Sequence, residues 1–127
     1  MIKWLLGVAA LSFAVSPWAS ELAQVESATT LIQVLDQNNK HVGHGSGFLI
    51  TPEGHIATND HVVRDAEKLK VFGGQFAKGM PARIVWQDKN LDLAVIKVTD
   101  ARQPFAALSL FSTAAEQALD VYAYGYP

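Results

Sequence analysis

Residues 48–58, FLITPEGHIAT, contain two short apolar runs separated by Thr51-Pro52-Glu53-Gly54. Proline presets the first bend of a tight turn, and glycine accepts the positive φ that such a turn often needs. The stretch therefore predicts a strand, a turn and a second strand. Similar runs of β-branched and aromatic residues lie on either side of it, bounded by glycine, proline, aspartate or asparagine; they cover 29–35, a strand resuming at 41, 69–72, 82–86 and 93–98.

The whole chain has the pattern of one all-β domain. It has 127 residues, half of them apolar, and short strands at this spacing favour an antiparallel barrel or sandwich. Residues 36–40, DQNNK, have turn chemistry and predict a hairpin between the first two runs. Residues 21–28 are expected to be a polar lead-in with at most one helical turn, and residues 111–119 could form either a helix or a loop.

Composition excludes several classes of site. The chain has no cysteine, which excludes disulfides, thiolate metal sites and a cysteine nucleophile. Its formal net charge is −2, which offers no basic footprint for nucleic acid or an anionic membrane. His41 and His44 are three residues apart on a predicted strand, so we expect them on opposite faces and not as joint metal ligands. No metal or organic cofactor is expected.

The N-terminus has the pattern of a secretory signal. Lys3 precedes about a dozen mostly apolar residues, and small polar residues follow. A membrane-spanning helix needs about 20 apolar residues, whereas this run is broken near Pro17. Residues 1–19 are therefore predicted to be a signal peptide cleaved after Ala19, with no stable membrane span. An exported chain without disulfides fits a bacterial periplasm.

His61 and Asp92 are the candidate catalytic residues. His61 follows the predicted strand 55–58, and Asp92 is in phase with the alternating apolar residues of the run 93–98, which predicts that they share one face. A carboxylate on that face needs hydrogen-bond donors, and an imidazole can donate through one ring nitrogen while the other acts as a base. We expect the two to meet across a closed barrel, as base and orienter of a serine hydroxyl. Spacing alone leaves open a surface histidine beside a solvated aspartate.

Three segments resemble the N-terminal half of a trypsin-like serine protease, in particular its HtrA (Deg) branch; they are GSGFLI at 45–50, GHIATNDHVV at 54–63 and DLAVIKV at 92–98. The resemblance extends over about residues 31–127. It implies that residues 20–127 form a six-stranded antiparallel barrel, the first barrel of a chymotrypsin/trypsin-like two-barrel fold. It also implies that His61 is the general base and Asp92 its orienter, and that YGYP at 124–127 is a short strand at the end of that barrel.

The nucleophile of that family lies outside this sequence. It belongs to a Gly-Asn-Ser-Gly-Gly type loop of the second barrel, and the 127 residues contain no such loop. By resemblance Ser46 lies in a core strand, whereas Ser109 and Ser112 lack flanking glycines. We therefore expect a truncated chain without the second barrel, inactive by itself.

The resemblance also implies partners for the complete protein. These are peptide or unfolded protein substrates in the periplasm, cleaved as part of protein quality control by an enzyme that can form homo-oligomers. The alternative is a catalytically inert β-barrel that binds peptides or a protein partner through exposed strand edges.

Overall fold

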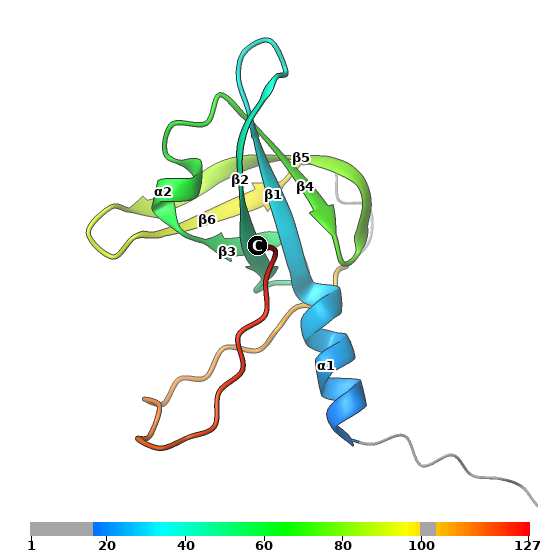
Figure 1. The fold of residues 1–127 in the computed structure, drawn as a ribbon, viewed down its shortest axis with the longest axis vertical. Helices are drawn as coiled ribbons and strands as arrows, with labels where there is room; N and C mark the ends of the chain where they lie inside the picture. The colour runs from blue at the N-terminus through cyan, green and yellow to red at the C-terminus, as the bar shows by residue number, and fades with distance from the viewer. Residues whose placement is uncertain (1–16, 100–103) are drawn as a thin grey trace, which may run out of the picture.

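The computed structural model describes residues 17–99 and 104–127. Its strands form one closed antiparallel barrel in the order β1-β2-β3-β6-β5-β4 (Figure 1). The prediction of a six-stranded antiparallel barrel is confirmed. The strands are β1 (Thr29–Leu35), β2 (His41–Leu49), β3 (His55–Thr58), β4 (Lys68–Gly73), β5 (Phe76–Asp88) and β6 (Leu93–Val98).

The barrel interior is filled by alternate residues of its strands. In β6, Ala94, Ile96 and Val98 are each at most 1% exposed, while the residues between them are partly accessible. This is the period of two that places every second side chain on one face of a strand. The core cluster has members on all six strands and on both helices; its buried members are Ala28, Ile32, Val34, Leu49, Ile56, Val63, Leu69, Val71, Phe76, Ala94, Ile96 and Val98.

Both predicted turns form. Between β1 and β2, the carboxylate of Asp36 accepts hydrogen bonds from the backbone N–H groups of Asn38 and Lys40, at 2.8 and 2.9 Å. Between β2 and β3, Gly54 has a φ of 98°. A β-carbon at this glycine would collide with Val98, so backbone conformation and space both favour glycine here.

Strand β5 is longer than the predicted run 82–86, because it begins at Phe76. Its first half pairs with β4 and its second half with β6, and the register shifts once on each side. Pro81 interrupts the sequence pattern but lies within the strand, where it pairs with Lys70 of β4 and its carbonyl oxygen accepts a hydrogen bond of 3.0 Å from the N–H of Thr99. The long bent strand lets the sheet turn a corner and close.

The lead-in before β1 is a helix, which corrects the expectation for residues 21–28. Helix α1 (Pro17–Ala28) has 12 residues and runs directly into β1 (Figure 1). Good helix formers dominate its sequence, but it lacks a strong apolar stripe, so periodicity does not reveal it. Residues 1–16 of the predicted signal peptide lie outside the described residues, and the predicted cleavage point after Ala19 falls within α1. None of the helices in the described ranges is long and apolar enough to cross a membrane.

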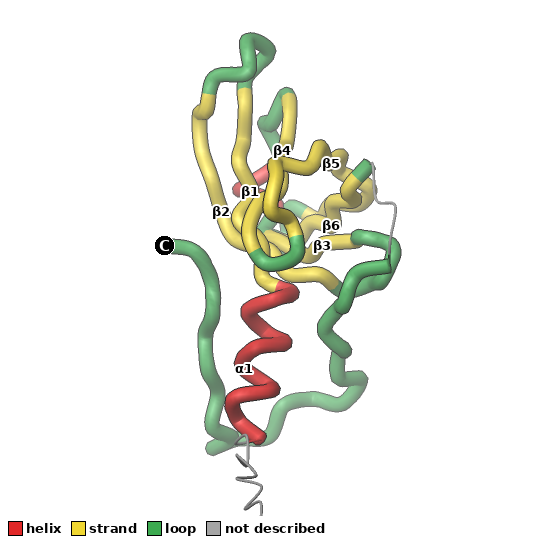
Figure 2. Tube along the Cα trace, turned by 90° about the vertical axis from the view of Figure 1, so that its right-hand side faces the viewer, coloured by secondary structure: helices red, strands yellow, loops and turns green. Residues whose placement is uncertain are grey.

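Residues 104–127 form an extended tail without helix or strand. The tail runs beside α1 and returns to the outside of β2 (Figure 2). There the carbonyl oxygen of Pro127 lies 3.2 Å from Nε2 of His44. Residues 111–119 are therefore loop, and the strand expected at 124–127 does not form.

Candidate active site

His61 and Asp92 lie at the same end of two neighbouring strands. His61 is in helix α2 (Asp60–Val63), which follows β3, and Asp92 immediately precedes β6. Strands β3 and β6 are paired, with Thr58 opposite Ala94. The two residues do meet, as expected. They do not meet across the barrel, because the sheet order makes their strands adjacent. They meet along one edge of the barrel end.

The two side chains make a double contact. The imidazole Nδ1 of His61 lies 2.6 Å from Oδ2 of Asp92, and the backbone N–H of His61 donates to Oδ1 at 2.8 Å. A proton on Nδ1 satisfies the carboxylate and leaves Nε2 with a free lone pair. Nε2 has no hydrogen-bond partner within the described ranges, and the His61 side chain is 57% exposed. The geometry thus presents an oriented base to solvent.

Asp92 is not on the apolar face that its phase with β6 predicted. Its φ is 52°, so the chain turns at Asp92 before the strand begins. Aspartate is one of the few residues that adopt this left-handed conformation readily. The turn directs the carboxylate toward α2 and leaves 43% of the side chain exposed. Asn59 supports the turn, because its side-chain amide donates to the backbone carbonyl of Asp92 at 3.1 Å.

The hydrogen bonds hold Asp92 in its charged form. The backbone N–H of His61 is the main cause that lowers the pKa of Asp92 below the ordinary value of 3.8, and the imidazole hydrogen bond is the second. Partial burial opposes the shift, whereas attraction to His61 and Arg64 adds to it. An ionised carboxylate at this position stabilises an imidazolium formed during proton transfer.

None of the three serines considered above is joined to His61 by a hydrogen bond in the described structure. The hydroxyl of Ser46 accepts from the backbone N–H of Tyr126 at 2.7 Å and lies 3.1 Å from that residue's carbonyl oxygen. Ser109 and Ser112 lie in the exposed tail. Within the described residues, the site therefore consists of the contacting pair His61 and Asp92.

The sequence comparison assigns the chain to a family. Residues 45–127 match the model of the trypsin-like peptidase domain. The chain belongs to this family. Two relatives, both named "Probable periplasmic serine endoprotease DegP-like", come from Chlamydia pneumoniae and Rhizobium meliloti. They are 40% identical over 67 residues and 42% identical over 59 residues, which cover 53% and 46% of this chain.

These matches cover a small part of the relatives. The aligned residues span 14% of the Chlamydia protein and 12% of the Rhizobium protein. The crystal structure of the serine endoprotease from Yersinia pestis is also similar, with a TM-score of 0.59 and 25% identity. That match covers 72% of this chain and 32% of the Yersinia chain. The likeness thus concerns one part of a trypsin-like protease domain.

In this trypsin-like peptidase domain, three further residues contribute to the site that sequence reasoning did not single out. Asn59 holds the backbone of Asp92, and Asp60 is buried beside His61. Gln87 on β5 donates to the Asp60 carboxylate at 2.8 Å. Asn59 and Asp60 directly precede His61, so their position in the motif was the available signal. Nothing in the local sequence identifies Gln87.

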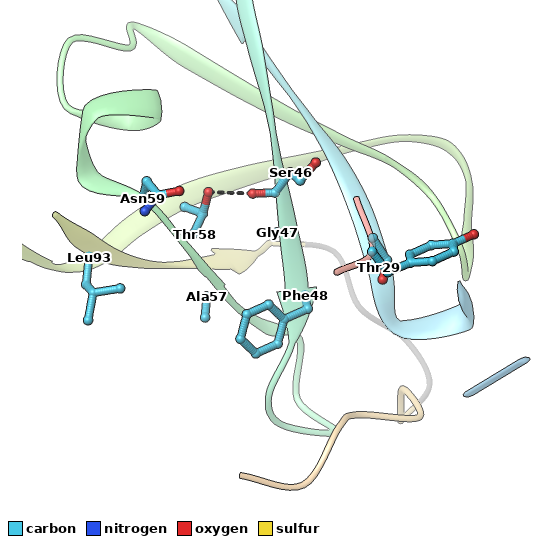
Figure 3. Close-up of a pocket in the computed structure, with 9 residues that line it drawn as sticks. Thr29, Ser46, Gly47, Phe48, Ala57, Thr58, Asn59 and Leu93 are labelled. Atoms are coloured by element: carbon cyan, nitrogen blue, oxygen red, sulfur yellow. Dashed lines mark hydrogen bonds between the residues drawn. The ribbon is translucent and has the colours of Figure 1, made fainter. Parts of the chain in front are cut away.

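A pocket lies on the outer surface, and its lining includes Asn59 and Leu93 (Figure 3). Phe48, Ala57 and Leu93 provide its apolar walls, and the hydroxyl of Thr58 is turned aside to the Ser46 carbonyl at 2.8 Å. Leu93 follows Asp92 directly in the chain. The pocket thus offers an apolar surface that begins next to Asp92.

The two histidines at the start of β2 lie together, contrary to expectation. The rings of His41 and His44 are stacked with centroids 5.9 Å apart. A register shift opposite Val34 and Leu35 inserts one extra residue into β2, so side chains three apart reach the same face. No cluster of three or more potential metal ligands occurs within the described ranges.

Proposed function

We propose that this chain carries the base and orienter of a serine endopeptidase. The double contact between His61 and Asp92 is the observation that supports it. Both residues lie within the stretch 45–127 that matches the trypsin-like peptidase domain, in the two segments that resemble the motifs of its base and orienter. His61 serves as the general base and Asp92 fixes its tautomer. The nucleophilic serine and the oxyanion-binding N–H groups come from a second barrel in a longer polypeptide.

The chemistry follows from the free Nε2 of His61. As the serine oxygen attacks the peptide carbonyl carbon, Nε2 accepts the hydroxyl proton, and Asp92 stabilises the imidazolium. The proton then passes to the leaving amine nitrogen as the C–N bond breaks and an acyl-enzyme remains. Water then attacks the ester carbonyl carbon and gives a proton to Nε2. The proton passes from Nε2 to the serine oxygen as the ester C–O bond breaks, which releases the acid and restores the serine hydroxyl.

The proposed substrates are unfolded or misfolded exported proteins. The relatives named as periplasmic endoproteases support this location, as does the apolar run that follows Lys3. The pocket beside the site supports an extended substrate, because two of its apolar walls, Phe48 on β2 and Leu93 on β6, are exposed on the surface. In the complete protein we expect homo-oligomers.

The alternative of an inert binding module has weaker support. Each strand of the closed barrel has two neighbours, which disfavours binding by strand addition to a free edge. Such a module would have to bind through another surface. It would also leave the double contact between His61 and Asp92 without a chemical role.

A fluorophosphonate probe, which labels activated serines, tests the proposal. We expect no labelling of the 127-residue chain. We expect labelling of a product extended through a downstream glycine-flanked serine, and loss of that labelling in His61→Ala, because the serine then has no base.

His41→Ala is the matched control, since His41 is also an exposed histidine but lies at the far end of β2. It should retain labelling. Labelling of the 127-residue chain would place a nucleophile within it. Labelling of the longer product that survives His61→Ala would remove the proposed role of His61, and a downstream sequence without a glycine-flanked serine would remove the two-barrel proposal.

A further inference from the structure

Asp60 is an acidic side chain buried beside the candidate base. It is the first residue of α2 and is 2% exposed, and no other charged residue in the described ranges is buried. A buried carboxylate is costly unless hydrogen bonds and opposite charge compensate for lost hydration. The groups around Asp60 therefore determine whether α2 can remain in this position.

Two groups from different elements contact that carboxylate. Gln87 on β5 donates from Nε2 to Oδ1 at 2.8 Å, and Nε of Arg64 lies 3.5 Å from Oδ2. In the β5–β6 register, Gln87 pairs with Ala94, two residues after Asp92. The hydrogen bond from Gln87 thus ties the start of α2 to the part of the sheet from which Asp92 emerges.

Helix α2 needs such a tie because it has only four residues. A single helical turn is unfavourable by itself, since nucleation costs more than its first hydrogen bond returns. The side chain of Asn59 does not cap the helix, because it bonds to the backbone of Asp92 instead. Other contacts of α2 must therefore set its orientation.

The apolar contacts of α2 set how closely the helix packs against the barrel. Val63 is fully buried, and Val62 packs so closely on β2 that a β-carbon at Gly45 would lie 2.6 Å from a Val62 methyl group. Such contacts are not directional. The hydrogen bond between Gln87 and Asp60 is directional, and it acts on the residue next to His61.

The contact between His61 and Asp92 is sensitive to this orientation. One carboxylate receives both the backbone N–H and the imidazole of the same residue, at 2.8 and 2.6 Å. A small rotation of the first turn of α2 moves both donors together. Both hydrogen bonds then weaken, because they depend steeply on angle.

We propose that Asp60 is a positioning residue, which holds the first turn of α2 through Gln87 so that both donors of His61 meet Asp92. This role rests on the proposed function of His61 as the general base. Asp60 does not touch the substrate in this proposal and acts only through His61.

The test measures the carboxyl pKa of Asp92 in the folded 127-residue chain by ¹³C NMR titration, with the resonance assigned from Asp92→Asn. Loss of the His61 contacts raises this pKa toward 3.8, since those contacts are the main causes of its lowering. We expect such a rise in Asp60→Ala. Removal of a nearby negative charge by itself lowers the pKa of Asp92, so the sign of the change separates positioning from simple electrostatics.

Gln87→Ala is the second variant, and it keeps the test decisive if Asp60→Ala does not fold. The Gln87 side chain is exposed and uncharged, so its loss removes the hydrogen bond without a change in charge. We expect the pKa of Asp92 to rise here too. Asp60→Asn, which retains an acceptor for Gln87, should restore a value close to that of the parent chain.

Asp65→Ala is the matched control, because Asp65 is an exposed aspartate just after α2. It should not raise the pKa of Asp92. An unchanged or lowered pKa in both Asp60→Ala and Gln87→Ala, or in Gln87→Ala alone if the former does not fold, would overturn the proposal, even if the variants are less stable.

This experiment needs no nucleophile, so its outcome is separate from that of the labelling experiment. If the pKa does not rise but labelling of the longer product depends on His61, only the positioning role fails. If the pKa of Asp92 rises but labelling is independent of His61, the proposed function fails, whereas the positioning of His61 by Asp60 stands.

Discussion

The interior of the barrel and the end that carries His61 are built on different physical terms. Inside, residues such as Ile32 and Ile96 are fully buried and held by contacts from several strands. At the barrel end, His61 and Asp92 are about half exposed and held by a few hydrogen bonds. The interior is stabilised by loss of apolar surface from water. The barrel end is held by directional hydrogen bonds and by attraction between charges.

This difference separates stability from chemistry. The proposed base must be accessible to substrate, so burial cannot fix it, and hydrogen bonds to neighbouring elements hold it instead. In the positioning proposal, its orientation depends on Asn59, Asp60 and Gln87, which contribute little apolar burial. Substitutions in the interior should therefore lower the free energy of unfolding, whereas substitutions at the barrel end should lower activity.

The largest expected effect is on turnover. In a catalytically complete product, Asp92→Asn should lower kcat by about 10⁴-fold, because an amide favours the wrong imidazole tautomer. Thermal unfolding of the 127-residue chain should change little. Steady-state hydrolysis of an unfolded fluorogenic protein measures the first effect, and circular dichroism measures the second. Asp120→Asn, in the exposed tail, is the control, and an unchanged kcat in Asp92→Asn would show that another group orients His61.

The next effect is on stability. Ile32→Ala should lower the free energy of unfolding by about 2–5 kcal/mol, because it removes buried methyl groups and leaves a cavity. Ile32→Val should cost about 0.5–1.5 kcal/mol. Denaturant unfolding measures both losses. The pKa of Asp92 should be unchanged in folded Ile32→Val; a clear rise would mean that interior packing also sets the geometry of the site.

The smallest effect is on pH dependence. The pKa of Asp92 is lower in the folded chain than the ordinary 3.8, so its contribution to stability is present above that value. The contribution is lost as pH falls through the folded pKa. Asp92→Asn should therefore flatten the loss of stability on acidification below about pH 4. Denaturant unfolding from about pH 7 to about pH 3 measures it. Solvent exposure keeps the effect small, and an equal flattening in Asp120→Asn would assign it to overall charge.

The sequence predicted the strands well and one strand boundary poorly. The runs at 29–35, 55–58 and 93–98 match β1, β3 and β6, because apolar alternation and turn residues act locally. The start of β5 was missed because Pro81 interrupts the strand pattern in the sequence, whereas in the structure it lies next to Ala82, where β5 passes from pairing with β4 to pairing with β6. The prediction that His41 and His44 lie on opposite faces was wrong for a similar reason, since the extra residue in β2 is visible only in its pairing with β1.

By itself, the sequence determined which segments are strands, where the chain turns and which imidazole and carboxylate are the candidates. Local backbone preferences and side-chain periodicity carry that information within a few residues. Only the tertiary structure decided that β3 and β6 are neighbours, that Asp92 turns outward at a positive φ, and that Gln87 reaches Asp60. The hydrogen bonds from Gln87 to Asp60 and from His61 to Asp92 join residues 27 and 31 positions apart, and the paired residues of β3 and β6 are further apart still. They exist only once the register of the closed barrel brings those segments together.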